Sequence, residues 1–181
     1  GYDLLTYEGD ILRLKFWATA FEILKASGTV FLQTEGKLAG CWVMRIEADT
    51  ASPAVAGTRA EPAADQDPEA REKVIVRSNG VVTYVGKDIA NQFWKFGLLG
   101  RDFLYQRRRD QWDGRPLWAT ISHDGQAGAP SFGGAQRIYN VIDSRQLYLQ
   151  ALLSQALRVL GHDREARNSI HFSYEMVALS I

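Results

Sequence analysis

The sequence of 181 residues is poor in the residues that form disulfide bonds or metal sites. Its single cysteine, Cys41, excludes an internal disulfide bond, and its three histidines (His123, His162 and His171) do not have the spacing of a zinc site. One thiol also fits a reducing compartment. We therefore expect a cytoplasmic protein with neither a metal centre nor a disulfide framework.

The sequence also has no excess of one charge and no long apolar run. Twenty-one basic residues balance twenty-one acidic ones, so any contact with RNA must be local rather than driven by the charge of the whole chain. No apolar segment approaches the roughly 18 residues of a membrane span, and we expect no membrane partner. Apolar residues nevertheless make up 46% of the chain, which predicts a globular core.

Residues 48–72 differ sharply in composition from the rest of the chain. They contain eight Ala, three of the five Pro and no aromatic residue. Such a segment cannot bury enough apolar surface to offset the entropy lost on ordering, so we expect a flexible insertion without chemistry. The predicted organisation is therefore a helix with connecting strands in residues 1–47, the insertion in 48–72, and the main α/β body in 73–181.

Hydrophobic periodicity predicts alternating strands and helices around this insertion. Residues 10–27 and 144–160 have apolar side chains at helical spacing, and the second helix has a cap at Asp143 or Ser144 and an end at Gly161. β-type runs occupy residues 29–33, 41–46, 74–76, 137–143 and 169–179. This order is typical of a parallel, right-handed βαβ arrangement.

Residues 101–135 carry an arginine run, Arg107 to Arg109, with Trp112 and Trp118 nearby, and we expect this segment to be irregular. A basic run beside aromatic side chains can contact an RNA backbone or stack on a base. Such runs also occur on solvated surfaces, where long side chains lie along the protein with their charged ends in water. The sequence alone leaves both interpretations open.

The most informative segment is residues 73–99, where a strand pattern changes into a helical one. Tyr84 and Asp88 lie four residues apart at that junction. Because open α/β sheets bind ligands at the carboxyl ends of strands, a phenol and a carboxylate there are well placed for a cationic substrate. The structural alternative is an N-cap for Asp88 and half-buried packing for Tyr84.

The run R-S-x-G-x-x-T-Y-x-x-x-D-I-A at residues 77–90 resembles the second half of the catalytic domain of class I arginyl-tRNA synthetases. In that family the Tyr and the Asp contact the substrate arginine, which implies this role for Tyr84 and Asp88. The upstream runs L-x-x-S-G-T-V-F and E-G-K-L-A-G-C-W-V are also similar to the family. The resemblance implies an α/β fold with a Rossmann-like parallel sheet, the second half of the synthetase nucleotide fold.

Two further segments resemble parts of the family that bind arginine and ATP. The run I-Y-N-V-I-D-S-R-Q ends at Gln146, and in the family a Gln in this place completes the arginine pocket with its donor and acceptor groups. The run H-F-S-Y-E-M-V resembles the family's segment beside the adenine, which implies ATP contacts for His171 and Val177, with Mg as the counter-ion of ATP. From position alone, Gln146 could equally be an exposed residue in the first turn of a helix, and residues 171–177 could equally be a strand that packs into the core.

This sequence departs from the family pattern at two turns. Asp143 and Ser144 stand where many relatives carry a Gly near the ribose, and Glu175 replaces another usual Gly. These departures favour an alternative in which the chain is a non-catalytic, synthetase-like arginine-binding module. A third interpretation is an unrelated α/β domain in which Tyr84 and Asp88 only pack and cap.

The function implied by the resemblance is that of an arginine–tRNA ligase, which activates arginine with ATP and transfers it to tRNA(Arg). A carboxylate pairs with the planar guanidinium of arginine in bidentate fashion. ATP activates the carboxyl group of arginine without a side-chain nucleophile, because correct positioning of the substrates suffices, so we expect no catalytic residue here. The HIGH-type and KMSKS-type motifs of the family do not occur in the sequence. We therefore expect a fragment that is inactive without the remaining parts of its parent chain.

Overall fold

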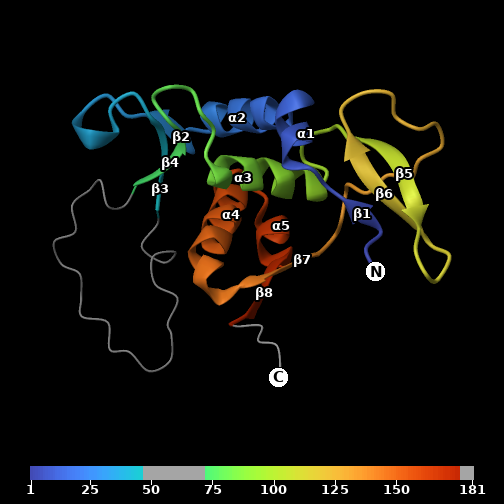
Figure 1. The fold of residues 1–181 in the computed structure, drawn as a ribbon. Coiled ribbons are helices and arrows are strands. Elements are labelled where there is room, and N and C mark those ends of the chain that lie inside the picture. Colours follow the sequence, from blue (N-terminus) through green and yellow to red (C-terminus); the bar gives the residue numbers. More distant parts are fainter. Residues whose placement is uncertain (47–71, 176–181) are drawn as a thin grey trace, which may run out of the picture. The chain divides into compact units, whose positions relative to one another are not determined.

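The computed structural model describes residues 1–46 and 72–175 (Figure 1). The predicted insertion, except for Glu72, and the predicted adenine contact Val177 lie outside these described residues. The chain divides into two compact units, and each unit combines two separate stretches of sequence. Unit 1 consists of Gly1–Ile23 and Lys87–Gln136, and unit 2 consists of Leu24–Gly86 and Arg137–Ile181.

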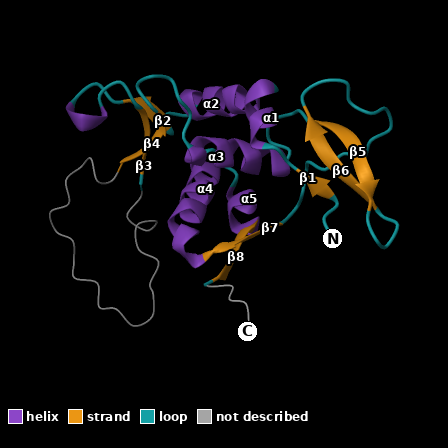
Figure 2. Cartoon of the chain, viewed as in Figure 1, coloured by secondary structure: helices purple, strands orange, loops and turns teal. Residues whose placement is uncertain are grey.

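Unit 1 is built on a three-stranded sheet in the order β1-β6-β5. Strand β1 (Leu4–Leu5) pairs in parallel with β6 (Pro116–Ile121), and β5 (Leu104–Asp110) pairs with β6 in antiparallel fashion. The expectation of an irregular segment at 101–135 was therefore wrong in part, because two of its stretches form a hairpin (Figure 2). Unit 1 also contains α1 (Glu8–Arg13) and most of the helices α2 (Phe16–Ala26) and α3 (Tyr84–Lys95).

The single helix expected at residues 10–27 is interrupted. Lys15 has a φ of 58° and separates α1 from α2, although neither glycine nor proline marks the break. Asp10, the first residue of the expected helix, lies inside α1 and is 4% exposed. Its carboxylate accepts the hydroxyl hydrogen of Thr120 over 2.7 Å, which connects α1 to strand β6.

Unit 2 contains an antiparallel sheet in the order β2-β3-β4, formed by Val30–Leu32, Trp42–Arg45 and Glu72–Val76. The short 3-10 helix η1 (Gly36–Leu38) lies between β2 and β3. These strands confirm the β-type runs expected from the sequence. Strand β4 precedes Tyr84, so the strand expected to end beside a ligand belongs to an antiparallel sheet rather than to a parallel one.

The second part of unit 2 is a parallel pair of strands, β7 (Ile138–Asp143) and β8 (Ser169–Tyr174). The connection between them contains the 3-10 helix η4 (Ser144–Gln146), α4 (Leu147–Val159) and α5 (Asp163–Asn168). This parallel strand–helix–strand order was predicted. The fold as described is mixed α/β with parallel and antiparallel pairing, and a Rossmann-like sheet stays a prediction.

No helix within residues 1–46 and 72–175 combines the length and the apolar character that crossing a membrane requires.

Candidate functional site

The start of helix α3 is fixed by a tight reversal of the chain after β4. Gly80, with a φ of 81°, donates its N–H to the Arg77 carbonyl over 2.8 Å, and Val82 then forms an isolated antiparallel bridge with Val76. Thr83 donates its N–H to the Ile75 carbonyl over 2.9 Å, and its hydroxyl reaches the same strand. The residue before the helix is thereby bound to β4, and the helix begins at the next residue.

Helix α3 begins at Tyr84, four residues earlier than the sequence pattern indicated. Asp88 therefore lies in the second turn, and the N-cap interpretation of this carboxylate was wrong. Tyr84 and Asp88 occupy positions i and i+4, which share one face of an α-helix. Tyr84 is 60% exposed, whereas Asp88 is partly buried.

A stripe of polar side chains continues along this face of α3. Asn91 and Lys95 follow Asp88 at spacings of three and seven residues, and we call Tyr84, Asp88, Asn91 and Lys95 the polar stripe. The amide oxygen Oδ1 of Asn91 is buried without a hydrogen-bond partner among the described residues. Buried polar atoms usually have a partner, so an orphaned acceptor beside Asp88 suggests a ligand group.

Burial shifts the pKa values of both charged members of the polar stripe. Burial raises the pKa of Asp88 above its usual value, Glu8 adds to the increase, and Lys95 and Lys87 oppose it. Burial lowers the pKa of Lys95, and the attraction of Asp88 opposes that change. The surroundings of Asp88 thus disfavour its charged form.

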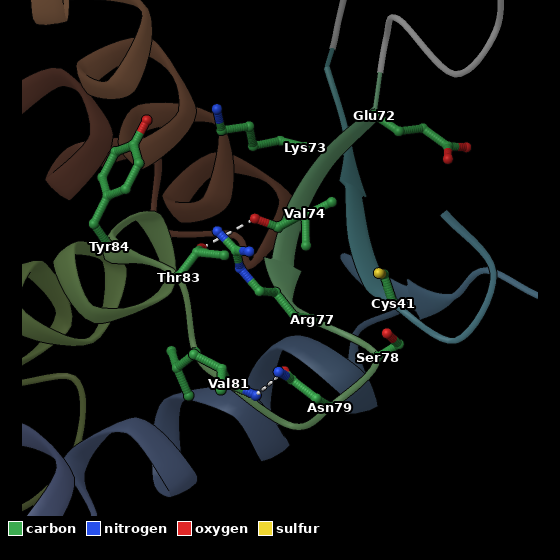
Figure 3. Close-up of a pocket in the computed structure, with 11 residues that line it drawn as sticks. Cys41, Glu72, Lys73, Val74, Arg77, Ser78, Asn79, Val81, Thr83 and Tyr84 are labelled. Carbon is green, nitrogen blue, oxygen red and sulfur yellow. Dashed lines mark hydrogen bonds between the residues drawn. The ribbon is translucent and has the colours of Figure 1, made fainter. Parts of the chain in front are cut away.

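Tyr84 also lines an open cavity of about 750 Å³ within unit 2 (Figure 3). The side chain of Lys73, at the start of β4, extends toward the ring of Tyr84, and Glu72 points in the opposite direction (Figure 3). The ammonium Nζ of Lys73 lies 5.6 Å from the ring centroid of Tyr84 and 5.5 Å from that of Tyr148. Two aromatic faces therefore already attract a cation at this place.

Gln146 is the last residue of η4 and precedes α4. It is exposed, and its side chain makes no capping hydrogen bond to the helix. Tyr148 lies two residues further along and shares Lys73 with Tyr84, so unit 2 places the beginning of α4 close to the beginning of α3.

The turn before Gln146, where the family usually has a Gly, does not require a glycine in this chain. The φ of Asp143 is −50°, which any residue can adopt. The Asp143 carboxylate accepts the backbone N–H of Arg145 over 2.8 Å and pairs with the guanidinium of the same residue at 2.7 Å. These hydrogen bonds lower the pKa of Asp143 to about 2. The carboxylate is therefore engaged by its own neighbour.

His171 lies on β8, opposite Asn140 of β7. Its Nε2 lies 3.0 Å from the carbonyl oxygen of Ile142, to which it donates in the corresponding tautomer, and its Nδ1 is buried without a partner among the described residues. The hydrogen bond to Ile142 of β7 thus fixes the imidazole ring, and Nδ1 is left as an acceptor without a partner among the described residues. Val177 lies outside the described residues.

Sequence reasoning missed Lys73 and Tyr148 because their approach to Tyr84 depends on contacts between separate elements. Asn91 and Lys95 carried a usable signal, since they continue the spacing of Tyr84 and Asp88 along one helix.

Known proteins give a consistent match, although no family model matches the chain. The arginine–tRNA ligase of Deinococcus radiodurans is 38% identical over 179 residues, covering 98% of this chain and 27% of that protein. An arginine–tRNA ligase of Thermus thermophilus is 39% identical over 178 residues, which cover 98% of this chain and 26% of that protein. The arginine–tRNA ligase of Pyrococcus abyssi is 34% identical over 179 residues, which cover 97% of this chain and 25% of that protein.

A solved structure agrees with these relatives. The Thermus thermophilus arginyl-tRNA synthetase matches with a TM-score of 0.70 and 34% identity, over 97% of this chain and 26% of that one. The chain spans about a quarter of the length of the curated relatives it matches. It is therefore homologous to one part of the arginyl-tRNA synthetases and matches that part over nearly its whole length.

Proposed function

We propose that the intact protein carrying this chain is a cytoplasmic arginine–tRNA ligase, which activates arginine with ATP and transfers the arginyl group to tRNA(Arg). The main support is the placement of Tyr84 and Asp88 at i and i+4 on α3, inside a segment homologous to such ligases. The chain contributes the arginine pocket in this proposal. The other parts of the parent chain contribute the remaining groups.

In the proposed pocket, Asp88 binds the guanidinium of the substrate. A carboxylate whose pKa is raised by burial lacks full compensation in the free protein, and a planar cation with paired N–H donors supplies it. Tyr84 offers a ring face and a hydroxyl from one turn away, and the unpartnered Oδ1 of Asn91 adds an acceptor. For Gln146, the family resemblance implies a role in orienting the ammonium group of the amino acid. Lysine cannot satisfy this set, because its ammonium lacks the planar fork of donors.

ATP would lie against β7 and β8 in this proposal. The buried, unused Nδ1 of His171 fits a hydrogen bond from a nucleotide, and the backbone near Val177 would contact the base. Mg would accompany ATP as its counter-ion and neutralise phosphate charge. This chain positions the arginine carboxylate for activation and provides no nucleophilic side chain. None is needed, because positioning the two bound substrates and stabilising the developing charge suffice for activation.

The chain alone is expected to be inactive, because it contains neither a HIGH-type nor a KMSKS-type motif. The alternative, a non-catalytic arginine-binding module, is favoured by Asp143 and Glu175 at positions where the family usually has Gly. Both proposals require arginine binding. They differ in whether the intact protein charges tRNA.

The test combines a charging assay with a calorimetric titration of the intact protein. A ligase transfers labelled arginine to tRNA(Arg) in the presence of ATP, whereas binding without transfer would support the module. In either case Asp88→Ala should weaken arginine binding by about 2–5 kcal/mol, the range for losing one partner of a desolvated charge pair. The control Glu35→Ala removes an exposed carboxylate that makes no side-chain capping bond, and it should change nothing. An unchanged affinity in Asp88→Ala would exclude Asp88 as the guanidinium partner.

A further inference from the structure

The hairpin of β5 and β6 presents a tryptophan that its own unit does not cover. Trp112 lies in the turn between the two strands and is 93% exposed. The turn itself is held in place, because Gln111 donates from its side-chain amide to the Tyr2 carbonyl over 2.8 Å. The ordered turn therefore holds both faces of the indole ring in solvent, where a base can stack on them.

The arginine run lies on the strand that leads to this turn. Arg107 is held by an ion pair with Asp110, whereas the side chain of Arg109 is exposed and makes no hydrogen bond, ion pair or ring contact with the described residues. The hairpin carries four arginines against two aspartates between residues 104 and 121. The local excess of positive charge contrasts with the neutral chain as a whole.

A shift in strand register redirects the middle arginine. The pairing of β5 with β6 shifts between Arg107 and Arg109, which leaves Arg108 outside the regular ladder. The guanidinium carbon of Arg108 lies 5.9 Å from the ring centroid of Tyr7. Bulges commonly turn one side chain toward a functional surface.

Arg108 reaches an open hollow of about 480 Å³ within unit 1. Arg13, Gln106 and His123 also line it, together with the carboxylates of Asp10 and Asp124. Asp10 accepts the Thr120 hydroxyl and lies 3.9 Å from the guanidinium of Arg13, and Asp124 lies 2.9 Å from His123. Arg108 is therefore the exposed cation of the hollow that has no carboxylate partner among the described residues, and it can contact a phosphate.

We propose that the β5–β6 hairpin binds single-stranded RNA, with a base stacked on Trp112 and phosphates contacted by Arg108 and Arg109. Aromatic stacking combined with a basic track is the usual way in which proteins hold unpaired nucleotides. The inference rests on the proposed function, because it assigns a surface to the RNA substrate of that function. The local placement of the charge also explains how a chain of no net charge binds RNA.

The test measures binding of a labelled 12-nucleotide single-stranded RNA to the intact protein by fluorescence anisotropy. Trp112→Ala should weaken binding roughly tenfold to a hundredfold, which corresponds to the loss of one stacked base. Arg109→Gln should reduce the slope of log K against log salt by about 0.7, the contribution of one phosphate contact to a single strand. Tyr139→Ala and Arg164→Gln, exposed substitutions on unit 2, serve as matched controls and should leave both quantities unchanged.

A second readout locates the contact. Ultraviolet cross-linking followed by peptide mapping should place RNA on the peptide containing Trp112. Unchanged binding in Trp112→Ala, equal losses in the controls, or cross-links confined to other peptides would overturn the inference. So would self-association of the protein that Trp112→Ala abolishes while RNA binding stays intact, since Trp112 would then contact a second copy.

Failure of this inference is distinguishable from failure of the proposed function. Arginine titration of Trp112→Ala should give the wild-type affinity, because Trp112 lies outside the polar stripe. If Asp88→Ala leaves arginine binding unchanged while Trp112→Ala still weakens RNA binding, the arginine pocket is wrong and the RNA surface stands.

Discussion

The carboxylate of Asp102 accepts the indole N–H of Trp94 over 2.7 Å, joining the end of α3 to the segment that enters β5. The same carboxylate accepts the Phe103 backbone N–H over 2.9 Å and the Ser131 hydroxyl hydrogen over 2.6 Å, and the hydroxyl of Tyr105 also donates to it. The ring of Phe103 also packs edge-on against Trp94, with the ring centroids 4.8 Å apart. Asp102 thus organises the part of unit 1 from which the hairpin projects.

Replacing Asp102 with Ala should lower the free energy of unfolding by about 1–3 kcal/mol, because the buried Trp94 N–H loses its acceptor. Urea unfolding at pH 7 measures the change. Asp102→Asn keeps one acceptor oxygen and should cost less. Equal free energies of unfolding for the wild type and Asp102→Ala would show that the hydrogen bonds to Asp102 do not stabilise the fold.

The stabilisation by Asp102 should also depend on pH. Burial raises the pKa of Asp102, but hydrogen bonds from Ser131, Tyr105 and Trp94 outweigh it, so the folded pKa lies below the usual value of 3.8. The unfolded state then binds more protons in this range, and the stabilisation is present above pH 3.8 and is lost as pH falls through the folded pKa. The stability difference between wild type and Asp102→Ala should therefore shrink in acid. A constant difference between pH 7 and pH 3 would contradict this assignment.

The buried carboxylate of Asp10 depends on Thr120. Its hydroxyl donates to Asp10 over 2.7 Å and accepts the Tyr7 backbone N–H over 3.0 Å. Thr120→Val preserves the shape but removes both bonds, and we expect a loss of about 1–3 kcal/mol in thermal or urea unfolding. Thr120→Ser retains the hydroxyl and should recover most of it. Similar losses for Val and Ser would assign the effect to packing instead.

Asp88 should show the opposite pH behaviour to Asp102. Its folded pKa is raised, mainly by burial, so its charged form is disfavoured in the folded protein even with Lys95 nearby. That destabilisation is absent below pH 3.8, where both states are protonated, and is complete above the folded pKa. Asp88→Asn should therefore raise the melting temperature at pH 7 and have little effect near pH 3. A lower melting temperature at pH 7 would show that Asp88 is compensated within the protein.

Local patterns predicted the elements whose signals lie within a few residues. Helix α4 has buried leucines at helical spacing, Asp143 caps the preceding turn, and Gly161 with a φ of 79° follows its end. The parallel pair β7 and β8 was expected from the helical segment between two apolar runs. Each of these inferences uses information contained in one stretch of chain.

Features that depend on distant partners were not predictable. The hairpin of β5 and β6 was hidden because three consecutive arginines obscure the alternation of a strand. The break at Lys15 has no Gly or Pro to mark it. The early start of α3 depends on hydrogen bonds between Thr83 and β4, which no residue spacing reveals. At the candidate site, the resemblance supplied Tyr84, Asp88 and Gln146, whereas the aromatic contacts of Lys73 required the structure.

The central claim is that Asp88 recognises the guanidinium of arginine, and paired titrations with arginine and citrulline test it most directly. Citrulline has nearly the same shape, but a neutral urea group replaces the cation. The wild-type protein should prefer arginine strongly, and Asp88→Asn should lose about 2–5 kcal/mol for arginine while citrulline binding changes little. If Asp88→Asn retains the wild-type preference for arginine over citrulline, the assignment of Asp88 is wrong.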